Sequence, residues 1–253
     1  EVPSAKVTRV SACIQRQPRI THNYLRPGRL NMWFTLSGRS AEDNHRLIER
    51  IRTRSGLAVA REFPAVKTYK IDARFTLGRR SASAAALPGR ALRRTIPVPA
   101  AADLAVLAQE IPLCPEPFAA IASRLGRSRQ QVIACLRRYR ANGFIRRLGA
   151  VLEHNRVGLR CNCMVAWEAQ DGGIDALGRE CRRMPQVSHC YQRLPGPGWP
   201  FNFYTMVHAS SPGESRRIIA LILRRNKHTI KQYRVLPTLA ELKKTRMDPR
   251  WMR

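Results

Sequence analysis

The sequence contains one pattern twice, and this repeat restricts the fold of the chain more than any other feature. In the first half, RITHNYLRPGRLNMWFTLSG is followed by a helical pattern, AEDNHRLIERIRTRSG, and then by VKTYKI. In the second half, QVSHCYQRLPGPGWPFNFYTMVHA is followed by GESRRIIALILRRN and then by IKQYRV. Both copies therefore predict two strands, a helix and a further strand in the same order.

The two copies align residue by residue. In the first strand, His22 falls on His189, Tyr24 on Tyr191 and Arg26 on Arg193. The next loop is three residues longer in the second copy. Beyond it, the alignment gives these pairs: Phe34 with Tyr204, Thr35 with Thr205, Lys67 with Lys231, and Tyr69 with Tyr233.

The second copy is preceded by a further strand and helix, CNCMVAWEA and IDALGRECRRM. Residues 160–247 therefore predict the order βαββαβ, which is ferredoxin-like. The first copy, within residues 1–77, has only a helix before its repeat, so we expect an incomplete, N-terminally truncated unit. The expected fold class is α+β, with two ferredoxin-like units.

Residues 101–159 predict a winged helix-turn-helix. Apolar residues recur at helical spacing from Phe118 to Leu125, and Gly126 ends that helix. Ser128 and Gln131 form a capping box at the start of the next helix. A small hairpin is expected over 143–159. Residues 78–100 are basic and rich in Ala and Pro, which is typical of a linker, and 248–253 are expected to be a tail.

The chain is strongly basic, with a formal net charge of +29. This charge favours a polyanionic partner, namely nucleic acid, phosphates or a polycarboxylate, although a GC-rich coding sequence would also enrich Arg. Seven Cys are too few for a disulfide scaffold, which favours a reducing, cytoplasmic compartment. No apolar run reaches the roughly 18–20 residues of a membrane helix, so no membrane partner is expected.

A winged helix-turn-helix followed by a βαββαβ unit resembles the Lrp/AsnC regulators. The words THNYLR with NMWFTL, and SHCYQR with WPFNFYTMVH and ELKKTRM, resemble the sirohaem decarboxylases, which share that fold. The first unit resembles the AhbA/NirD type and the second the AhbB/NirL type, so the chain is most similar to a fused NirDL. The resemblance covers about residues 5–77 and 105–248.

The resemblance implies a reaction. A sirohaem decarboxylase removes CO2 from the C12 and C18 acetates of sirohaem and leaves methyl groups. The product, 12,18-didecarboxysirohaem, is a precursor of haem d1 or, by an alternative route, of haem b. No cofactor is implied beyond the iron tetrapyrrole substrate.

The chemistry of this substrate sets requirements for the site. Its carboxylates surround a flat, apolar ring, so cations and apolar walls are needed. Loss of CO2 leaves carbanion character that must be protonated, and His is the natural donor near neutral pH. A cation on a departing carboxylate would stabilise it against loss. We therefore expect cations to hold the retained carboxylates and the reactive ones to lie in less polar surroundings.

His22 and His189 are the predicted catalytic residues. Because side chains alternate along a strand, each His shares a face with the Tyr and the Arg that follow it. Either His could instead simply pack beneath a helix. The predicted substrate-binding residues are Tyr24, Arg26, Trp33, Tyr191, Arg193, Tyr204, His208, Lys70 and Arg234.

Several of these residues have other readings. His208 could be an axial iron ligand, a second proton donor or a surface histidine. Strand aromatics are often core residues. Cys161, Cys163, Cys181 and Cys190 do not have the C-x₂-C spacing of zinc sites, so no metal site is predicted.

Two other functions are weighed against the enzyme. A DNA-binding regulator would use 128–141 as its recognition helix, but regulators have no reason to repeat the His–Tyr–Arg words. A haem sensor would bind iron through His22 or His189 and leave the tetrapyrrole unchanged. We also expect a homo-oligomer, or pairing between the two units, because such units leave one sheet face to be covered.

Overall fold

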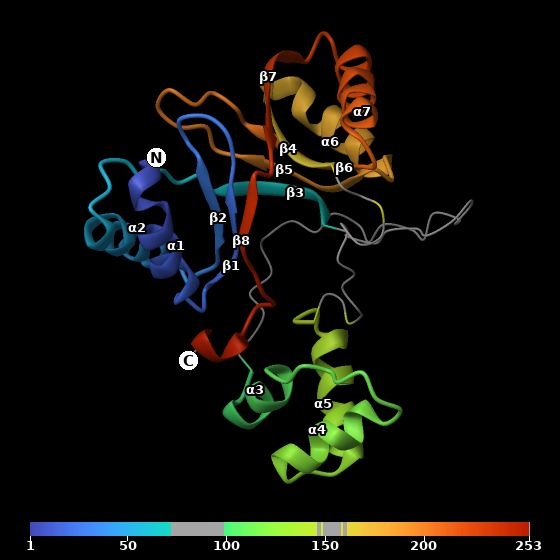
Figure 1. Cartoon of the computed structure of the whole chain (residues 1–253). Coiled ribbons are helices and arrows are strands. Elements are labelled where there is room, and N and C mark those ends of the chain that lie inside the picture. The colour runs from blue at the N-terminus through green and yellow to red at the C-terminus, as the bar shows by residue number, and fades with distance from the viewer. Residues whose placement is uncertain (72–98, 146–147, 149–157, 159–160, 253) are drawn as a thin grey trace.

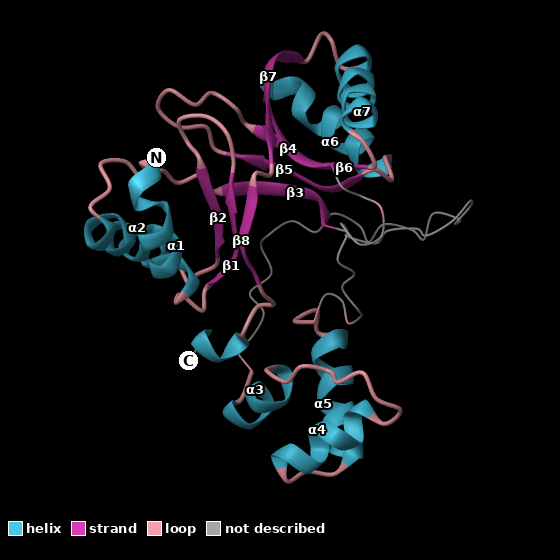
Figure 2. Ribbon diagram, viewed as in Figure 1, coloured by secondary structure: helices cyan, strands magenta, loops and turns pink. Residues whose placement is uncertain are grey.

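The computed structural model describes residues 1–71, 99–145, 148, 158 and 161–252. Two α+β units lie against each other, and a helical unit lies apart from them (Figures 1 and 2). The α+β class and the helix-turn-helix agree with the sequence. The expected linker falls largely in 72–98, and the expected wing largely in 146–160, so both lie mostly outside the described residues.

The second unit has the predicted βαββαβ order. Its elements are β4 (Cys161–Ala169), α6 (Ile174–Arg183), β5 (Val187–Arg193), β6 (Phe203–Ala209), α7 (Pro212–Arg225) and β7 (Ile230–Pro237), with a 3-10 turn, η2 (Asp171–Gly173), before α6. The antiparallel strands lie in the order β5-β6-β4-β7. Both helices cover one face, where Val165, Leu177 and Ile222 are fully buried.

The first unit is smaller. It contains η1 (Ser4–Lys6), α1 (Val7–Gln15), β1 (Ile20–Leu25), β2 (Met32–Leu36) and α2 (Ala41–Ser55). Ser40 caps the start of α2, and Gly56 ends it in the left-handed conformation that Gly adopts readily. The two helices bury Val10, Ile14 and Leu47 against Ile20 on one face of the sheet.

Each unit gives one strand to the sheet of the other. β3 (Ala65–Ile71), from the first unit, pairs with β5 and completes a five-stranded sheet, β3-β5-β6-β4-β7. β8 (Ala240–Lys244), from the second unit, pairs with β1 and completes a three-stranded sheet, β2-β1-β8 (Figure 1). The expected ranges 1–77 and 160–247 are therefore interlocked.

This exchange corrects the sequence alignment of the last strand. In the structure β3 is the equivalent of β8 and not of β7. β3 pairs with β5 and β8 pairs with β1, and β5 and β1 are the strands that carry the repeated His, Tyr and Arg. Pro64 and Pro237 precede the two exchanged strands in equivalent positions. Tyr69 and Tyr233, aligned in the sequence, accordingly differ: Tyr69 is buried and Tyr233 is exposed.

A second correction concerns the strand after the longer loop. Tyr24 lies opposite Trp33, and Tyr191 lies opposite Tyr204. The structural equivalent of Tyr204 is therefore Trp33 and not Phe34. The connection between the two strands is therefore four residues longer in the second copy, and not three.

Buried contacts hold β3 on the second unit. The ring of Tyr69 lies directly over Gly178 of α6, and its hydroxyl donates a hydrogen bond to Asp175. Lys67 forms an ion pair with the same carboxylate at 2.6 Å. Burial, and then the bond to Asp175, raises the pKa of Tyr69 well above its usual range. Asp175 therefore binds two side chains of the exchanged strand.

The helical unit consists of α3 (Ala101–Leu107), α4 (Pro117–Leu125) and α5 (Arg129–Ala141). The predicted capping box at Ser128 and Gln131 is present, and Gly126 ends α4 in the left-handed conformation. Ile121, Val132 and Tyr139 form its small core. Two arginines of α5 are paired, Arg129 with Glu116 and Arg138 with Asp103.

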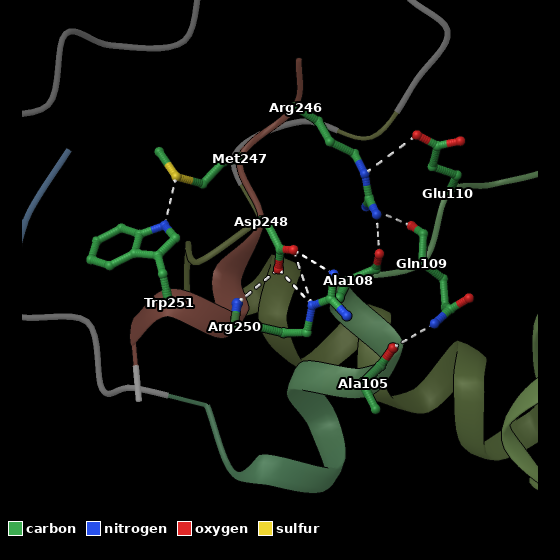
Figure 3. Close-up of polar contacts among 9 residues, drawn as sticks. All are labelled: Ala105, Ala108, Gln109, Glu110, Arg246, Met247, Asp248, Arg250 and Trp251. Carbon is green, nitrogen blue, oxygen red and sulfur yellow. Dashed lines mark hydrogen bonds and ion pairs between the residues drawn. The ribbon is translucent and has the colours of Figure 1, made fainter. Parts of the chain in front are cut away.

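The segment after β8 contacts both the first sheet and the helical unit, and Figure 3 shows its contacts with the helical unit. The Thr245 N–H donates to Thr21 O at 2.8 Å. The Arg246 guanidinium donates to Ala108 O and Gln109 O, carbonyls at the C-terminal end of α3 where a cation is favoured. The expected tail forms η3 (Pro249–Met252), which contacts α3.

In the part of the chain that the structure describes, no helix is both long and apolar enough to cross a membrane.

Replacing Gly178 with Ala tests the packing of β3 against α6. An Ala Cβ there would lie 2.4 Å from the Tyr69 ring, so the exchanged strand must shift. Gly to Ala inside a helix usually stabilises by about 0.5–1 kcal/mol. Here we expect a loss of about 1–3 kcal/mol, as for overpacked cores, measured by urea unfolding.

Gly172→Ala is the control, because its Cβ would meet nothing within 4 Å. Its free energy of unfolding should change by no more than about 0.5 kcal/mol. Equal effects from the two variants would contradict the placement of β3.

Candidate active site

The helix-free faces of the two sheets meet in an apolar cluster. From the second unit, Met164, Ala166, Trp199, Phe201, Tyr204 and Leu236 are buried there, and Leu30, Trp33 and Phe63 of the first unit pack against them. The side-chain alternation of the strands places six predicted site residues on this face of the five-stranded sheet. They are His189, Tyr191, Arg193, Tyr204, His208 and Arg234.

The aromatic candidates lie within this contact. Trp33 is half-buried, 5.6 Å from Phe63 and 5.4 Å from Trp199 between ring centroids. Tyr204 is fully buried and its hydroxyl accepts a hydrogen bond from Trp199 Nε1, while Tyr191 stacks on its ring. Burial raises the pKa of Tyr204 well above its usual range. Trp33 and Tyr191 keep exposed surface, whereas Tyr204 serves as their support.

Arg26 and Arg193 have matching contacts at the junction of the units. Arg26 donates to Leu236 O at 2.6 Å, and Arg193 donates to Phe63 O at 2.5 Å. Each accepting carbonyl lies one residue before the proline that precedes an exchanged strand. The Arg26 guanidinium also lies over the ring of Tyr24, and the Arg193 guanidinium over the ring of Tyr191. The structure thus gives both arginines a role in joining the units.

Arg26 has further capacity for hydrogen bonding. It is only 2% exposed, and within the described residues its Nε has no partner. No carboxylate of the described residues is among the groups that shift its pKa, which burial lowers. A buried cation without an anion is costly, so an anion brought to this place would be stabilised.

His22 lies on β1 beside a lysine. Its Nδ1 is 2.8 Å from Thr21 Oγ1, and its cross-strand neighbour on β8 is Lys244. Burial, and then the charge of Lys244, lowers the pKa of His22, while Glu241 opposes this effect. Neutral His22 is therefore favoured near pH 7.

His189 lies in a chain of hydrogen bonds. Ser188 Oγ is 2.7 Å from His189 Nδ1 and 2.6 Å from His208 Nε2. His208 Nδ1 is 2.5 Å from Asn162 Oδ1. Both ring nitrogens of His208 are thus engaged, so it could bind iron only by giving up one of these bonds.

The two histidines are equivalent in fold but not in surroundings. The cross-strand neighbour of His189 on β3 is Ile71, where His22 has Lys244. His208 has its structural counterpart at Ser37, since Trp33 matches Tyr204. The second unit therefore offers an apolar neighbour and a second imidazole, and the first offers a cation.

Lys70 and Arg234 are the remaining cationic candidates. Lys70 Nζ donates to Met184 O at 2.8 Å, at the end of α6. Arg234 is exposed on β7, with its guanidinium 5.1 Å from the centre of the Trp199 ring. Their roles in substrate binding stay predictions.

Sequence reasoning missed Ser188, Asn162, Ile71 and Lys244 as members of the site. A signal for the first was present, because a hydroxyl residue precedes His in both repeated words, Thr21 in one and Ser188 in the other. The others come from strands whose pairing the sequence does not give.

Comparison with known proteins agrees with this architecture. The family model described as "AsnC-like ligand binding domain" matches residues 1–70 and 156–243, and the model "Siroheme decarboxylase NirDL-like HTH domain" matches 104–146. The "Siroheme decarboxylase NirDL subunit" of Paracoccus denitrificans is 31% identical over 95% of this chain and 70% of its own length.

The chain belongs to the sirohaem decarboxylase family. It is therefore an enzyme of the carboxy-lyase class. The NirDL subunit of Paracoccus pantotrophus is 33% identical over 86% of this chain and 67% of its own length. The siroheme decarboxylase of Hydrogenobacter thermophilus is 28% identical over 98% and 74%.

A solved structure shares the fold. The crystal structure of the siroheme decarboxylase NirDL superposes with a TM-score of 0.65 and 24% identity, covering 99% of this chain and 74% of that one. A structure of NirDL in complex with an iron-uroporphyrin III analogue gives the same score at 23% identity.

Replacing Lys244 with Met should raise the pKa of His22. The positive charge of Lys244 opposes protonation of the ring, and its removal leaves Glu241, which favours protonation. The pKa should move toward the ordinary value of about 6.5. NMR titration of the ring protons measures this shift.

Lys243→Met is the matched control. Lys243 is the adjacent lysine, and its Nζ donates to Gln15 O and Gln17 O. Lys243→Met should leave the pKa of His22 unchanged. An unchanged pKa in Lys244→Met would contradict the described surroundings of His22.

Proposed function

We propose that this enzyme removes CO2 from the C12 and C18 acetates of sirohaem and forms 12,18-didecarboxysirohaem for haem d1 synthesis or, alternatively, for haem b. The observation that carries the proposal is the repeated His–Tyr–Arg word, held on equivalent strands of two interlocked units. Its membership of the sirohaem decarboxylase family supports the same reaction.

Each decarboxylation breaks the bond between the acetate CH₂ and its carboxylate. CO2 leaves, and the electron pair stays on the CH₂, where the conjugated macrocycle delocalises it. One proton delivered to that carbon gives the methyl group. No oxidant or reductant is required, and we propose no cofactor besides the iron tetrapyrrole substrate.

His22 and His189 are the proposed proton donors. Each has its Nδ1 beside a hydroxyl of the preceding residue, which leaves Nε2 as the nitrogen directed away from that hydroxyl. Both rings are half-buried, which limits their contact with solvent.

Cations and rings would hold the retained groups of the substrate. Arg26 carries a buried N–H without a partner in the described residues, which a carboxylate would satisfy. Arg193, Lys70 and Arg234 supply further positive charge, while Tyr24, Tyr191 and Trp33 supply flat surfaces. Burial raises the pKa of Tyr24 to about 12, so its hydroxyl stays protonated and can donate.

The proposed partners are sirohaem and a further copy of this chain. The units of one chain already pair, and we propose homo-oligomers in addition. Seven free thiols suit a cytoplasmic setting.

Anaerobic incubation with sirohaem, followed by mass spectrometry of the extracted tetrapyrrole, tests the reaction. Loss of two CO2 is expected. An unchanged tetrapyrrole that co-purifies would favour a haem sensor. Absence of tetrapyrrole binding, with tight sequence-selective DNA binding, would favour a regulator.

His22→Ala and His189→Ala should each lower the rate at least about tenfold, since a general acid contributes roughly 10²–10⁴. His228→Ala is the control, because His228 is exposed after α7. Wild-type rates in both His22→Ala and His189→Ala would overturn the assignment.

A further inference from the structure

Ser188 connects two imidazoles through short hydrogen bonds. It is 2% exposed, and its only side-chain oxygen lies within 2.7 Å of both His189 Nδ1 and His208 Nε2. Asn162 Oδ1 forms a hydrogen bond with the other ring nitrogen of His208, Nδ1. These residues come from three neighbouring strands, β4, β5 and β6, so the sheet itself sets their spacing.

The direction of the bonds follows from the acceptor at Asn162. Its Oδ1 only accepts, so His208 Nδ1–H donates to it. When His208 is neutral, its Nε2 accepts from the Ser188 hydroxyl, and Ser188 Oγ then accepts from His189 Nδ1–H. When His208 is protonated, its Nε2–H donates to Ser188 Oγ, and the hydroxyl donates to His189 Nδ1. Every bond is satisfied in both states.

When His189 is neutral in both states, the second state holds one proton more than the first. We propose that His208 stores the proton that His189 delivers to the substrate, with Ser188 as the bridge between them. This proposal rests on the proposed function. His208 Nε2–H passes its proton to Ser188 Oγ. The Ser188 hydroxyl proton passes to His189 Nδ1, and His189 Nε2–H goes to the acetate carbanion. His208 ends neutral and no ring becomes an imidazolate.

The relay is confined to the second unit. In the first unit Thr21 supplies the hydroxyl beside His22, but Ser37 stands where the second unit has His208. His22 therefore has a hydroxyl partner and no second imidazole at the equivalent position. This difference gives a matched pair of variants, Ser188→Ala and Thr21→Val.

The first test follows the two rings without substrate. In protein labelled with ¹⁵N-histidine, long-range NMR correlations report which ring nitrogen carries hydrogen. Protonation of His208 should switch neutral His189 from its Nδ1–H to its Nε2–H form. Lys70 on β3 and Cys161 on β4 are titratable groups flanking the chain of bonds, and both stay in every variant.

Ser188→Ala should uncouple the rings, so that the tautomer of His189 no longer follows His208. Thr21→Val should leave the coupling intact. Ser188→Thr should retain it, because the equivalent position in the first unit already holds Thr. Independent titration of His189 and His208 in the wild type would overturn the relay, whatever the activity of the protein.

The second test is the single-turnover rate in mixtures of H2O and D2O. The wild type should show a curved proton inventory, because several protons move together, and Ser188→Ala a linear one. Ser188→Ala and His208→Gln should also slow CO2 loss about tenfold or more, since a positioned acid contributes roughly 10²–10⁴ and both residues act through His189.

The two proposals can fail separately. A wild type that releases no CO2 but shows coupled rings would refute the proposed function and leave the relay standing. A wild type that releases CO2 at the same rate and with the same inventory as Ser188→Ala would refute the relay alone.

Discussion

The reciprocal exchange of β3 and β8 is the constraint on which the structure depends. Without these strands, β5 and β1 would expose unpaired backbone groups at the edges of their sheets. The exchange pairs both edges. It also places the hydrogen bond from the Tyr69 hydroxyl to Asp175, and the carbonyl contacts of Arg26 and Arg193, across the junction. Separating the units would break ladder bonds, aromatic packing and buried polar contacts together. The strands that carry His22 and His189 are therefore held by the other unit, and neither histidine is placed by its own repeat alone.

The exchange also makes two equivalent positions chemically different. The cross-strand neighbour of each histidine comes from the other unit, so the two neighbours need not be alike. His22 has Lys244 and His189 has Ile71. A cation lowers the pKa of His22 and attracts carboxylates, whereas an aliphatic neighbour disfavours a carboxylate's charge and so favours its loss. The two proposed proton donors therefore act in different electrostatic surroundings, a cationic one at His22 and a less polar one at His189.

The sequence was sufficient for local structure and for the residues that recur. The repeated words predicted two strands with His, Tyr and Arg on one face, and Ser128 with Gln131 predicted a helix start that the structure contains. The strand exchange could not be predicted, because a strand's pattern shows which side is buried but not which strand pairs with it. Lys67 and Tyr69 matched Lys231 and Tyr233 by letters alone, and that match hid the equivalence of β3 with β8. The contacts of Arg26 and Arg193 with backbone carbonyls were hidden for the same reason, since those carbonyls belong to the other unit.

The position of the helical unit follows from the same strand. β8 pairs with β1 beside His22, and the chain then continues directly into Arg246, which binds the carbonyl end of α3. Arg19 of the first unit lies over the Trp251 ring, so this segment is held from both sides. Two arginines of α5 that a DNA contact would use are already paired with carboxylates. A helix-turn-helix that grips the extension of an exchanged strand helps to keep that strand in place. The strand that it anchors carries Lys244, which lies opposite His22.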